Sequence, residues 1–494
     1  LPHLFILTLL ITLSVFVNAE TSVNGKELVF TMQITRHGAR SPTLDPPVNS
    51  TITEDEWKIT LGDLTEMGER QHYLTGKKMR KEYGNDGGII PQGYSSDEIA
   101  ILSTDFNRTI MSAYSELPGM FPLGTATSLS KAEVKQAKLP FTFQGDTKEI
   151  KNLKLKPTQE GFQPIPIHVG NIDALMRGMD GDICPYQSDL RHQYSNTNEF
   201  EDLNAKYQDI LFPEMIEKFN ADKDTLDMNS AYPYIDNYYS AYFDQMEITN
   251  ELSDKAQLQV ESILRDGLYE GFYGLDLAIR LATTRFFNFL QHTLQWKIDA
   301  ILEKDGVPHF YENIKFMFLS AHDSSLTAFM SGFQQKSNEQ AKFASNIHIE
   351  LYRDTEGKTG DSGDFSVIVK YNDKEINLGG EEICATECDF PTVKAFLKSR
   401  EYDGDLEETC NQNLKNNNSG AWLYVLLGFA IFIALANIAY FTIKAFSKKN
   451  TDGSESNEKG YSGLHDEEDP KRKGINISSS TTPASSRFVE DDSD

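Results

Sequence analysis

The chain has 494 residues and a formal net charge of −27, with 74 acidic against 47 basic residues. Nucleic acid binds to basic surfaces, so this acidity argues against a nucleic-acid partner, and any phosphate site must be local and enclosed. The four cysteines show no zinc-type grouping with histidine, so the sequence predicts no metal site.

An apolar run opens the chain and ends in Val17-Asn18-Ala19, a small-residue cleavage pattern. We predict a secretory signal peptide over residues 1–19, cut before Glu20, with a signal anchor as the alternative. The domain that follows, residues 20–410, would then fold in the lumen or outside the cell.

Three β-rich runs are each followed by a polar turn. The runs are Glu27–Thr35, Glu98–Thr104 and Ile314–Ser320. The turns carry Arg36, His37 and Arg40; then Asp105 and Arg108; then His322 and Asp323. Loops at the carboxyl ends of strands in an open parallel α/β sheet converge on one crevice, so we expect these side chains to meet. Thr104 or Asp105 is expected to cap the helix that follows the second run.

Together these residues predict a site for a phosphomonoester. Arginine forks match phosphate oxygens and remain charged. His37 would attack phosphorus and form a phosphohistidine, since the arginines should lower its pKa and keep it neutral. Asp323 would protonate the leaving alcohol, and His322 would bind the phosphate. No metal and no other cofactor is expected, because the arginines supply the positive charge.

The segment Arg36–Pro42, RHGARSP, resembles the RHGxRxP signature of the histidine acid phosphatases, branch 2 of the histidine phosphatase superfamily. Further segments that resemble this family follow in order: Leu64–Gly84, Ser103–Pro122, Gln163–His168 and Ser320–Leu326. The resemblance spans about residues 27–410. It implies that His37 is the nucleophile, Asp323 the proton donor, and that the phosphate ligands are Arg36, Arg40, Arg108 and His322. Leu102 departs from the pattern, because relatives often carry arginine there.

The expected fold is α/β, with a central mixed, mostly parallel sheet flanked by helices and a mainly helical cap insertion over about residues 123–310. A long apolar helix near Leu275–Leu302 would return the chain to the sheet. Asn346–Asp354 and Asp364–Asn377 look like late strands, the second with a hairpin near Asn372. By the resemblance, the cap covers the site and shapes the choice of substrate.

Four cysteines allow three pairings. The resemblance implies Cys184–Cys410 and Cys384–Cys388. Asn49 and Asn417 begin sequons and are predicted to be glycosylated. Asn107 also begins a sequon, but a glycan there would obstruct Arg108, so we predict that it is unmodified. His72 and His168 are expected to be structural or cap residues.

The uncharged run Ala421–Ile443 would span roughly 34 Å as a helix, which is enough to cross a bilayer. We predict a transmembrane helix over residues 421–446, after a polar stalk at 411–420. The lysines that follow place the C-terminus in the cytosol, as in a single-pass type I protein. Residues 447–494 should form a disordered cytosolic tail. Within it, Tyr461–Leu464 resembles a tyrosine-based sorting signal for an adaptor.

Four functions compete. The first is a membrane acid phosphatase of the lysosome, endosome or cell surface, similar to the lysosomal and prostatic acid phosphatases of the family. The second is a specialised inositol-phosphate or lysophospholipid phosphatase. A mutase-like transferase conflicts with the predicted signal and span, and an inactive receptor ectodomain conflicts with the complete set of site residues. The expected partners are a small phosphomonoester or a phosphoprotein as substrate, the membrane, and a second copy of the chain in a homodimer.

Overall fold

The computed structural model describes residues 22–412 apart from residues 24, 46–51, 87, 138, 142–145, 171 and 358, and in addition residue 431. The chain divides into two compact units, residues 1–420 and 421–494. The elements below all belong to the first unit.

Several predicted features lie outside the described residues. They are the signal peptide at 1–19, the sequons at Asn49 and Asn417, residues 413–420 of the stalk, the transmembrane helix at 421–446 except residue 431, and the tail at 447–494 with Tyr461–Leu464. Within the described part of the chain, no helix has both the length and the apolar character needed to cross a bilayer.

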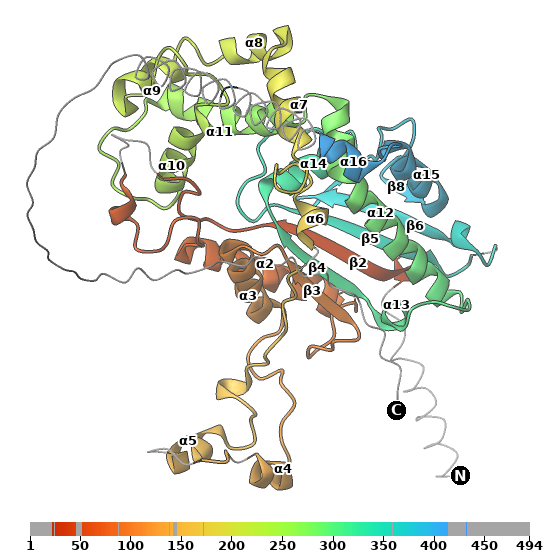
Figure 1. Ribbon diagram of the computed structural model, residues 1–494. Coiled ribbons are helices and arrows are strands. Elements are labelled where there is room, and N and C mark those ends of the chain that lie inside the picture. The colour runs from red at the N-terminus through yellow and green to blue at the C-terminus, as the bar shows by residue number, and fades with distance from the viewer. Residues whose placement is uncertain are drawn as a thin grey trace, which may run out of the picture. The chain divides into compact units, whose positions relative to one another are not determined.

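A mixed sheet of eight strands lies at the centre of the fold, in the order β3-β4-β2-β5-β6-β7, with β1 beside β2 and β8 beside β6 (Figure 1). The strands are β1 Ser22–Val23, β2 Lys26–Arg36, β3 Ile99–Ser103, β4 Phe316–Ala321, β5 Asn346–Asp354, β6 Phe365–Tyr371, β7 Lys374–Ile376 and β8 Glu387–Asp389. Strands β2, β3 and β4 are the three predicted from the sequence, and they run parallel to one another.

The prediction of a mostly parallel sheet is wrong, because five of the seven strand pairings among the described residues are antiparallel. Strands β5, β6 and β7 follow one another through short connections, and strands joined in this way pair antiparallel. The β6–β7 turn passes through Asn372 and Asp373, whose φ angles of 46° and 68° suit a two-residue hairpin. The late strands therefore extend the sheet, as predicted, but with reversed direction.

Helices cover the sheet and continue beyond it (Figure 1). The longer ones are α2 Glu66–Met79, α3 Asn107–Met120, α7 Tyr186–Ser195, α8 Asn198–Ala205, α9 Leu211–Phe219, α10 Tyr232–Phe243, α11 Asp254–Asp266, α12 Asp276–Ile301, α14 Asp323–Gly332 and α15 Phe390–Arg400. The short ones are η1 Glu54–Glu56, η2 Arg80–Asp86, α4 Lys131–Gln136, α5 Asp146–Leu153, η3 Gln159–Gly161, α6 Ile172–Met176, η4 Gly267–Phe272, α13 His309–Asn313, η5 Ser362–Asp364 and α16 Leu406–Cys410. The predicted long helix is α12.

Both faces of β2 are buried between helices. Phe30, Met32 and Ile34 are fully buried on one face, in the core that includes apolar residues of α12 and α14. Burying each such side chain contributes about 1.5–3 kcal/mol to folding. On the other face, Gln33 donates a hydrogen bond of 2.7 Å to Glu116 of α3. The strand that precedes the RHGARSP segment is thus held rigidly from both sides.

Helices α8 to α11 share an apolar core of their own, which includes Phe212, Met215, Ile235 and Tyr238. This core also contains Ala39, which lies in the turn after β2. Helices α8 to α11 therefore pack on the carboxyl end of β2, where the candidate site residues begin, whereas α4 and α5 lie apart from them (Figure 1).

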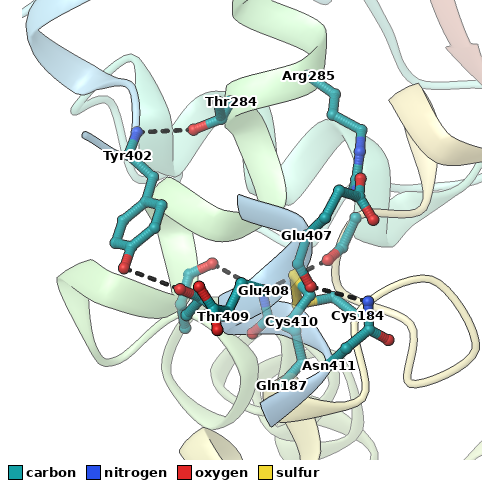
Figure 2. Close-up of a disulfide and its surroundings, with 12 residues drawn as sticks. Cys184, Gln187, Thr284, Arg285, Tyr402, Glu407, Glu408, Thr409, Cys410 and Asn411 are labelled. Atoms are coloured by element: carbon teal, nitrogen blue, oxygen red, sulfur yellow. Dashed lines mark hydrogen bonds and ion pairs between the residues drawn. A yellow bond between two sulfur atoms is a disulfide. The ribbon is translucent and has the colours of Figure 1, made fainter. Parts of the chain in front are cut away.

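Two disulfides join Cys184 to Cys410 and Cys384 to Cys388, the pairs that the resemblance implied. Figure 2 shows Cys184 bonded to Cys410 at the end of α16. Around this bond, the Tyr402 amide donates to the Thr284 hydroxyl of α12 over 2.8 Å. The Cys184–Cys410 disulfide therefore ties α16 to the segment that leads into α7.

Candidate active site

The three polar turns converge because β3, β4 and β2 are adjacent parallel strands. The His37 amide donates to the Ala321 carbonyl over 3.0 Å, and the Thr104 amide donates to the Ser320 carbonyl over 3.1 Å. These bonds hold the turns after β2 and β3 against the end of β4. The sequence predicted this meeting from three runs that each read as a strand followed by a polar turn.

A cavity of about 320 Å³ opens at this point. Its lining includes all six residues that the sequence singled out as catalytic or phosphate-binding: Arg36, His37, Arg40, Arg108, His322 and Asp323. The wall opposite the sheet comes from α10, α11 and η4. The cavity therefore lies between the carboxyl end of the parallel strands and the helical segment.

Gly38 allows the turn after β2 to approach α2 closely. A Cβ atom at this position would lie 2.6 Å from the Cα of Gly68. Real side-chain atoms do not come this close to backbone, so only glycine fits both positions without movement. The glycine of the RHGARSP segment thus sets the place of its neighbour His37.

His37 is held as a neutral imidazole with one nitrogen free to react. Its Nδ1 lies 2.9 Å from the Gly38 carbonyl oxygen. Because a carbonyl can only accept, Nδ1 carries the proton and Nε2 keeps its lone pair. Burial, and then the charges of Arg108, Arg36, Arg40 and His322, hold the pKa of His37 well below 6.5. Burial and the nearby positive charges therefore both favour the neutral ring.

His322 faces His37 across the cavity, with ring centroids 5.8 Å apart. Its Nε2 lies 2.9 Å from the Thr104 hydroxyl, and its Nδ1 lies 3.5 Å from Nη2 of Arg108. Arginine can only donate, so Nδ1 accepts and Nε2 carries the proton. Burial and four nearby arginines lower the pKa of His322 as well. Thr104, which sequence reasoning treated only as a helix cap, fixes this ring.

The arginines of the RHGARSP segment are each held by a carboxylate. Arg36 pairs with Asp323 at 2.8 Å and lies 4.3 Å from the centre of the Phe343 ring. Arg40 pairs with Asp236 of α10 through two contacts of 2.7 and 3.3 Å. The carboxylate of Asp236 raises the pKa of Arg40 above its ordinary value, against the effect of burial. Both guanidiniums are therefore fixed in place.

Arg108 is different, because no carboxylate lies within 4 Å of it among the described residues. Its guanidinium lies 4.5 Å from the centre of the Phe106 ring. Burial and the charge of Arg40 lower its pKa to about 10, so it still remains charged at any acid or neutral pH. Arg36, Arg40 and Arg108 share one feature: each has a buried Nε with no hydrogen-bond partner in the described structure.

Asp323 is the first residue of α14, and its Oδ1 accepts from the Ser324 amide over 2.8 Å. Burial alone would raise the pKa of this carboxyl. Arg36, Arg40, the Ser324 amide and Arg108 outweigh burial, and together they lower the pKa below its usual value. Asp323 is therefore ionised while the arginines have no other anion to pair with.

The predicted cap of α3 is wrong. Its N-cap is Phe106, in an extended conformation and without a side-chain hydrogen bond. Asp105 is exposed, and its amide donates to Asp173 over 3.0 Å. The Phe106 ring lies 4.5 Å from the guanidinium of Arg108 and 4.6 Å from that of Arg177.

The structural histidines lie away from the cavity. His72 is fully buried, with Nδ1 2.8 Å from Glu116. His168 forms an isolated bridge with Leu102 at the edge of β3. Among the described residues, no group of three or more His, Cys, Asp or Glu side chains is arranged to hold a metal ion.

Sequence reasoning missed the site residues that come from the helical segment. Asp236 stands in the aromatic run YPYIDNYYS, 196 positions after Arg40. A lone acid in an aromatic helix indicates a buried partner, but it does not say which one. Arg177 and Arg191 also line the cavity and carry no motif.

Comparison with known proteins adds to this geometry. The family model described as histidine phosphatase superfamily (branch 2) matches residues 27–372. Lysosomal acid phosphatase of Rattus norvegicus is 27% identical over 352 residues, which cover 70% of each chain. Lysosomal acid phosphatase of Xenopus laevis is 24% identical over 489 residues, 96% of this chain and 97% of the relative. Prostatic acid phosphatase of Bos taurus is 30% identical over 207 residues, 42% of this chain and 45% of the relative.

Solved structures are similar in fold. The apo form of Hafnia alvei phytase superposes with a TM-score of 0.55 at 14% identity, covering 79% of this chain and 99% of that chain. The phytase of Citrobacter braakii gives a TM-score of 0.53 at 14% identity, covering 76% and 98%. At such low identity, the likeness establishes a shared mixed α/β architecture.

Proposed function

Because this chain belongs to the histidine phosphatase superfamily, branch 2, and is a phosphatase, we propose that it hydrolyses phosphate monoesters at acid pH through a phosphohistidine on His37. The observation that carries this proposal is the set of three arginines around one neutral imidazole. All four side chains line the same cavity, and arginine guanidiniums match the oxygens of a phosphoryl group in geometry and charge.

In the first step, the Nε2 lone pair of His37 attacks phosphorus, and the bond between phosphorus and the ester oxygen breaks. Asp323 gives its proton to the departing oxygen, which leaves as an alcohol. Arg36, Arg40 and Arg108 neutralise the charge on the non-bridging oxygens in the transition state. In the second step, water attacks phosphorus, Asp323 takes up a proton from it, and phosphate and free His37 result.

The substrate itself supports the protonation of Asp323. Without another anion, the arginines lower the pKa of this carboxyl. A bound phosphate brings negative charge that offsets the arginines and repels a carboxylate, so the pKa of Asp323 rises. Acid pH then supplies the proton, while the low pKa of His37 keeps the nucleophile neutral. The two shifts together favour turnover in acid.

We also propose a lysosomal or extracellular location for the catalytic domain. Relatives named lysosomal acid phosphatase support it, and so do two disulfides, which persist in oxidising compartments. The transmembrane helix at 421–446, the cytosolic tail and glycans at Asn49 and Asn417 remain predictions from the sequence.

The experiment that tests the mechanism traps the covalent intermediate. The full chain in detergent, with a metal chelator present, is mixed with a ³²P-labelled aryl phosphate and quenched with alkaline denaturant. We expect base-stable, acid-labile label on a peptide containing His37, and none in a folded His37→Ala variant. Acid-stable label on another residue, or wild-type turnover by His37→Ala, would show that the nucleophile is assigned wrongly.

A further inference from the structure

One arginine of the cavity wall has no assigned partner. Arg191 extends from α7, and its guanidinium carbon lies 3.6 Å from the centre of the Phe272 ring. Its Nε is buried without a hydrogen-bond partner, and no carboxylate lies within 4 Å of it in the described part of the chain. Burial lowers its pKa, an effect that Tyr273 and Asp180 partly oppose. Arg191 therefore resembles Arg108, since both lie against an aromatic ring and neither has a carboxylate partner among the described residues. Arg108 forms, together with Arg36 and Arg40, what we call the phosphate cup.

The other arginine on this wall, Arg177, already has carboxylate partners. Arg177 pairs with Asp173 at 3.1 Å, Asp180 at 2.6 Å and Asp182 at 3.0 Å. Two arginines outside the cavity, Arg285 and Arg400, also have an unpartnered buried nitrogen. Each of those two has a carboxylate partner: Glu407 and Asp276, respectively. Arg191 is partly buried and has no such partner within the described structure, so a bound anion could pair with its guanidinium.

Arg191 shares the cavity with many apolar side chains. Those that line it from η4, α11 and the loops before α7 and α10 include Met179, Met228, Ile263, Leu264, Leu268 and Phe272. Methionine side chains adapt to different shapes, and aliphatic and aromatic carbons favour an apolar or planar body. An anion that reaches Arg191 must therefore be attached to such a body.

Tyr273 connects the surroundings of Arg191 with those of Asp323. The Tyr273 hydroxyl donates to the Ser324 carbonyl over 3.0 Å, and Ser324 follows Asp323 in α14. The charges of Arg191 and Asp323 both act on the buried Tyr273. If Asp323 protonates the ester oxygen, the alcohol portion of the substrate extends from Asp323 toward the wall that carries Arg191.

We propose that Arg191, stacked on Phe272, forms a second anion subsite that selects phosphomonoesters whose alcohol portion carries one further negative charge on an apolar or aromatic body. This inference rests on the proposed function. A single additional charge is expected, because Arg191 is the one cation of the described cavity wall beyond the phosphate cup that lacks a carboxylate partner. A polyphosphorylated alcohol would bring more charge than this wall can pair.

Two substrates of equal size test the subsite: 4-carboxyphenyl phosphate and 4-carbamoylphenyl phosphate, which differ in one negative charge. The full chain in detergent is assayed with both at about pH 5.5, where the carboxylate is ionised. We expect kcat/KM to be about tenfold higher for the carboxylate, mostly through KM, since a hydrogen bond to a charged group is worth about this factor. Added salt should reduce the ratio.

The variant Arg191→Gln should bring the ratio close to one, and Arg191→Lys should restore part of it. The matched control is Arg265→Gln in α11. Arg265 also lies over an aromatic ring, 5.4 Å from the centre of Tyr269, but it does not line the cavity. This control should keep the tenfold ratio.

Equal kcat/KM values for the two substrates in the wild type, or equal loss of the ratio in both variants, would overturn the subsite. A ratio that does not respond to salt would also contradict it, even if the variants fail to fold. The two proposals fail differently. If neither substrate is hydrolysed and no phosphohistidine forms, the proposed function is wrong; if both are hydrolysed equally, only the subsite is wrong.

Discussion

At the scale of single residues, the arginines of the cup differ in what holds them. Asp236 holds Arg40 and Asp323 holds Arg36, whereas Arg108 has only the ring of Phe106. The carboxylate of Asp236 stays on Arg40 throughout the proposed reaction. Asp323 must release Arg36 to act on the substrate. In the proposed reaction, Arg40 therefore donates hydrogen bonds to the phosphate from a fixed position. The positive charge of Arg36 instead acts on both the phosphate and Asp323.

The first prediction concerns Asp236→Asn. The pair is buried, with 4% and 5% of the two side chains exposed, so the variant leaves an unpaired guanidinium. We expect a loss of about 3 kcal/mol in the free energy of unfolding. Inorganic phosphate should then raise the melting temperature more in the variant than in the wild type, because it supplies the missing anion.

Thermal unfolding with and without phosphate measures this effect. Glu261→Gln is the control, since Glu261 pairs with Lys342 at 3.6 Å with about half of each side chain exposed, and such pairs contribute little. A variant Asp236→Asn as stable as the wild type would contradict the role given to the pair.

The second prediction concerns Asp323→Asn. An alkyl phosphate has a poor leaving group, so its kcat should fall roughly 10²- to 10⁴-fold without the proton donor. A 4-nitrophenyl phosphate needs little protonation of its leaving group, and we expect a much smaller loss. The measurement is the steady-state kcat of the wild type and of Asp323→Asn on both substrates. An equal loss on both would indicate that Asp323 acts only by holding Arg36.

At the scale of elements, α2 and α3 touch through backbone, and this contact positions Arg108 at the start of α3. A Cβ at Gly76 would lie 2.0 Å from the Glu116 carbonyl oxygen, and one at Gly119 would lie 2.4 Å from the Tyr73 carbonyl oxygen. Neither neighbour is a flexible side chain, so the helices would have to separate. The glycines in this pair of helices thus determine how close α3 lies to the cavity.

The third prediction follows for Gly76→Ala. Forcing the helices apart should cost at least about 2 kcal/mol of unfolding free energy and reduce kcat/KM, because Arg108 moves with α3. Gly267→Ala is the control for stability. Its added Cβ meets nothing within 4 Å, so we expect a gain of about 0.5–1 kcal/mol. Urea unfolding curves give the free energy of unfolding of both variants. An equal change in the two would show that the close contact at Gly76 does not determine the loss of stability.

The elements also show how far the sequence predicts the structure. The strand ends that carry Arg36 and His322 were predictable, because β-rich runs followed by charged turns have a clear pattern. Asp236 and Arg191 were not, since they come from helices whose sequence does not reveal which part of the sheet they cover. The hairpin near Asn372 was predictable from its turn residues, but the antiparallel pairing of β5 with β2 was not, since the apolar pattern does not show which strands become neighbours.

At the scale of the whole molecule, the Cys184–Cys410 disulfide closes a loop of 226 residues that includes the helices over the cavity. Constraining so long a loop in the unfolded chain should stabilise the fold by about 5 kcal/mol on the chain-entropy model. The Cys384–Cys388 loop spans 4 residues, and the same model gives about 2 kcal/mol.

The fourth prediction compares the two double variants. Cys184→Ser with Cys410→Ser should lower the urea midpoint clearly more than Cys384→Ser with Cys388→Ser. Both are measured without reductant, at equal protein concentration. A reversed order would mean that local packing around the short loop, and not loop length, determines the contribution of each disulfide.

The fifth prediction concerns acid stability. Burial lowers the pKa of His348 in β5 to about 3, with Lys78 and Lys370 adding to the shift and Asp373 opposing it. Between pH 3 and about 6.5, the unfolded chain binds a proton at this position that the folded chain does not. Stability therefore falls as the pH drops through this range, by up to about 1.4 kcal/mol per pH unit.

Replacing this histidine by leucine removes the linked proton, so the free energy of unfolding of His348→Leu should depend less steeply on pH between about 3.5 and 6. His37 and His322, whose pKa values are also lowered, keep their contributions in both proteins. In the proposed reaction, the neutral imidazoles therefore lower the stability of the folded chain in acid, and His348 adds to this loss although it does not line the cavity. Urea unfolding across that pH range tests the point, and parallel curves for the two proteins would show that His348 is protonated in the folded state.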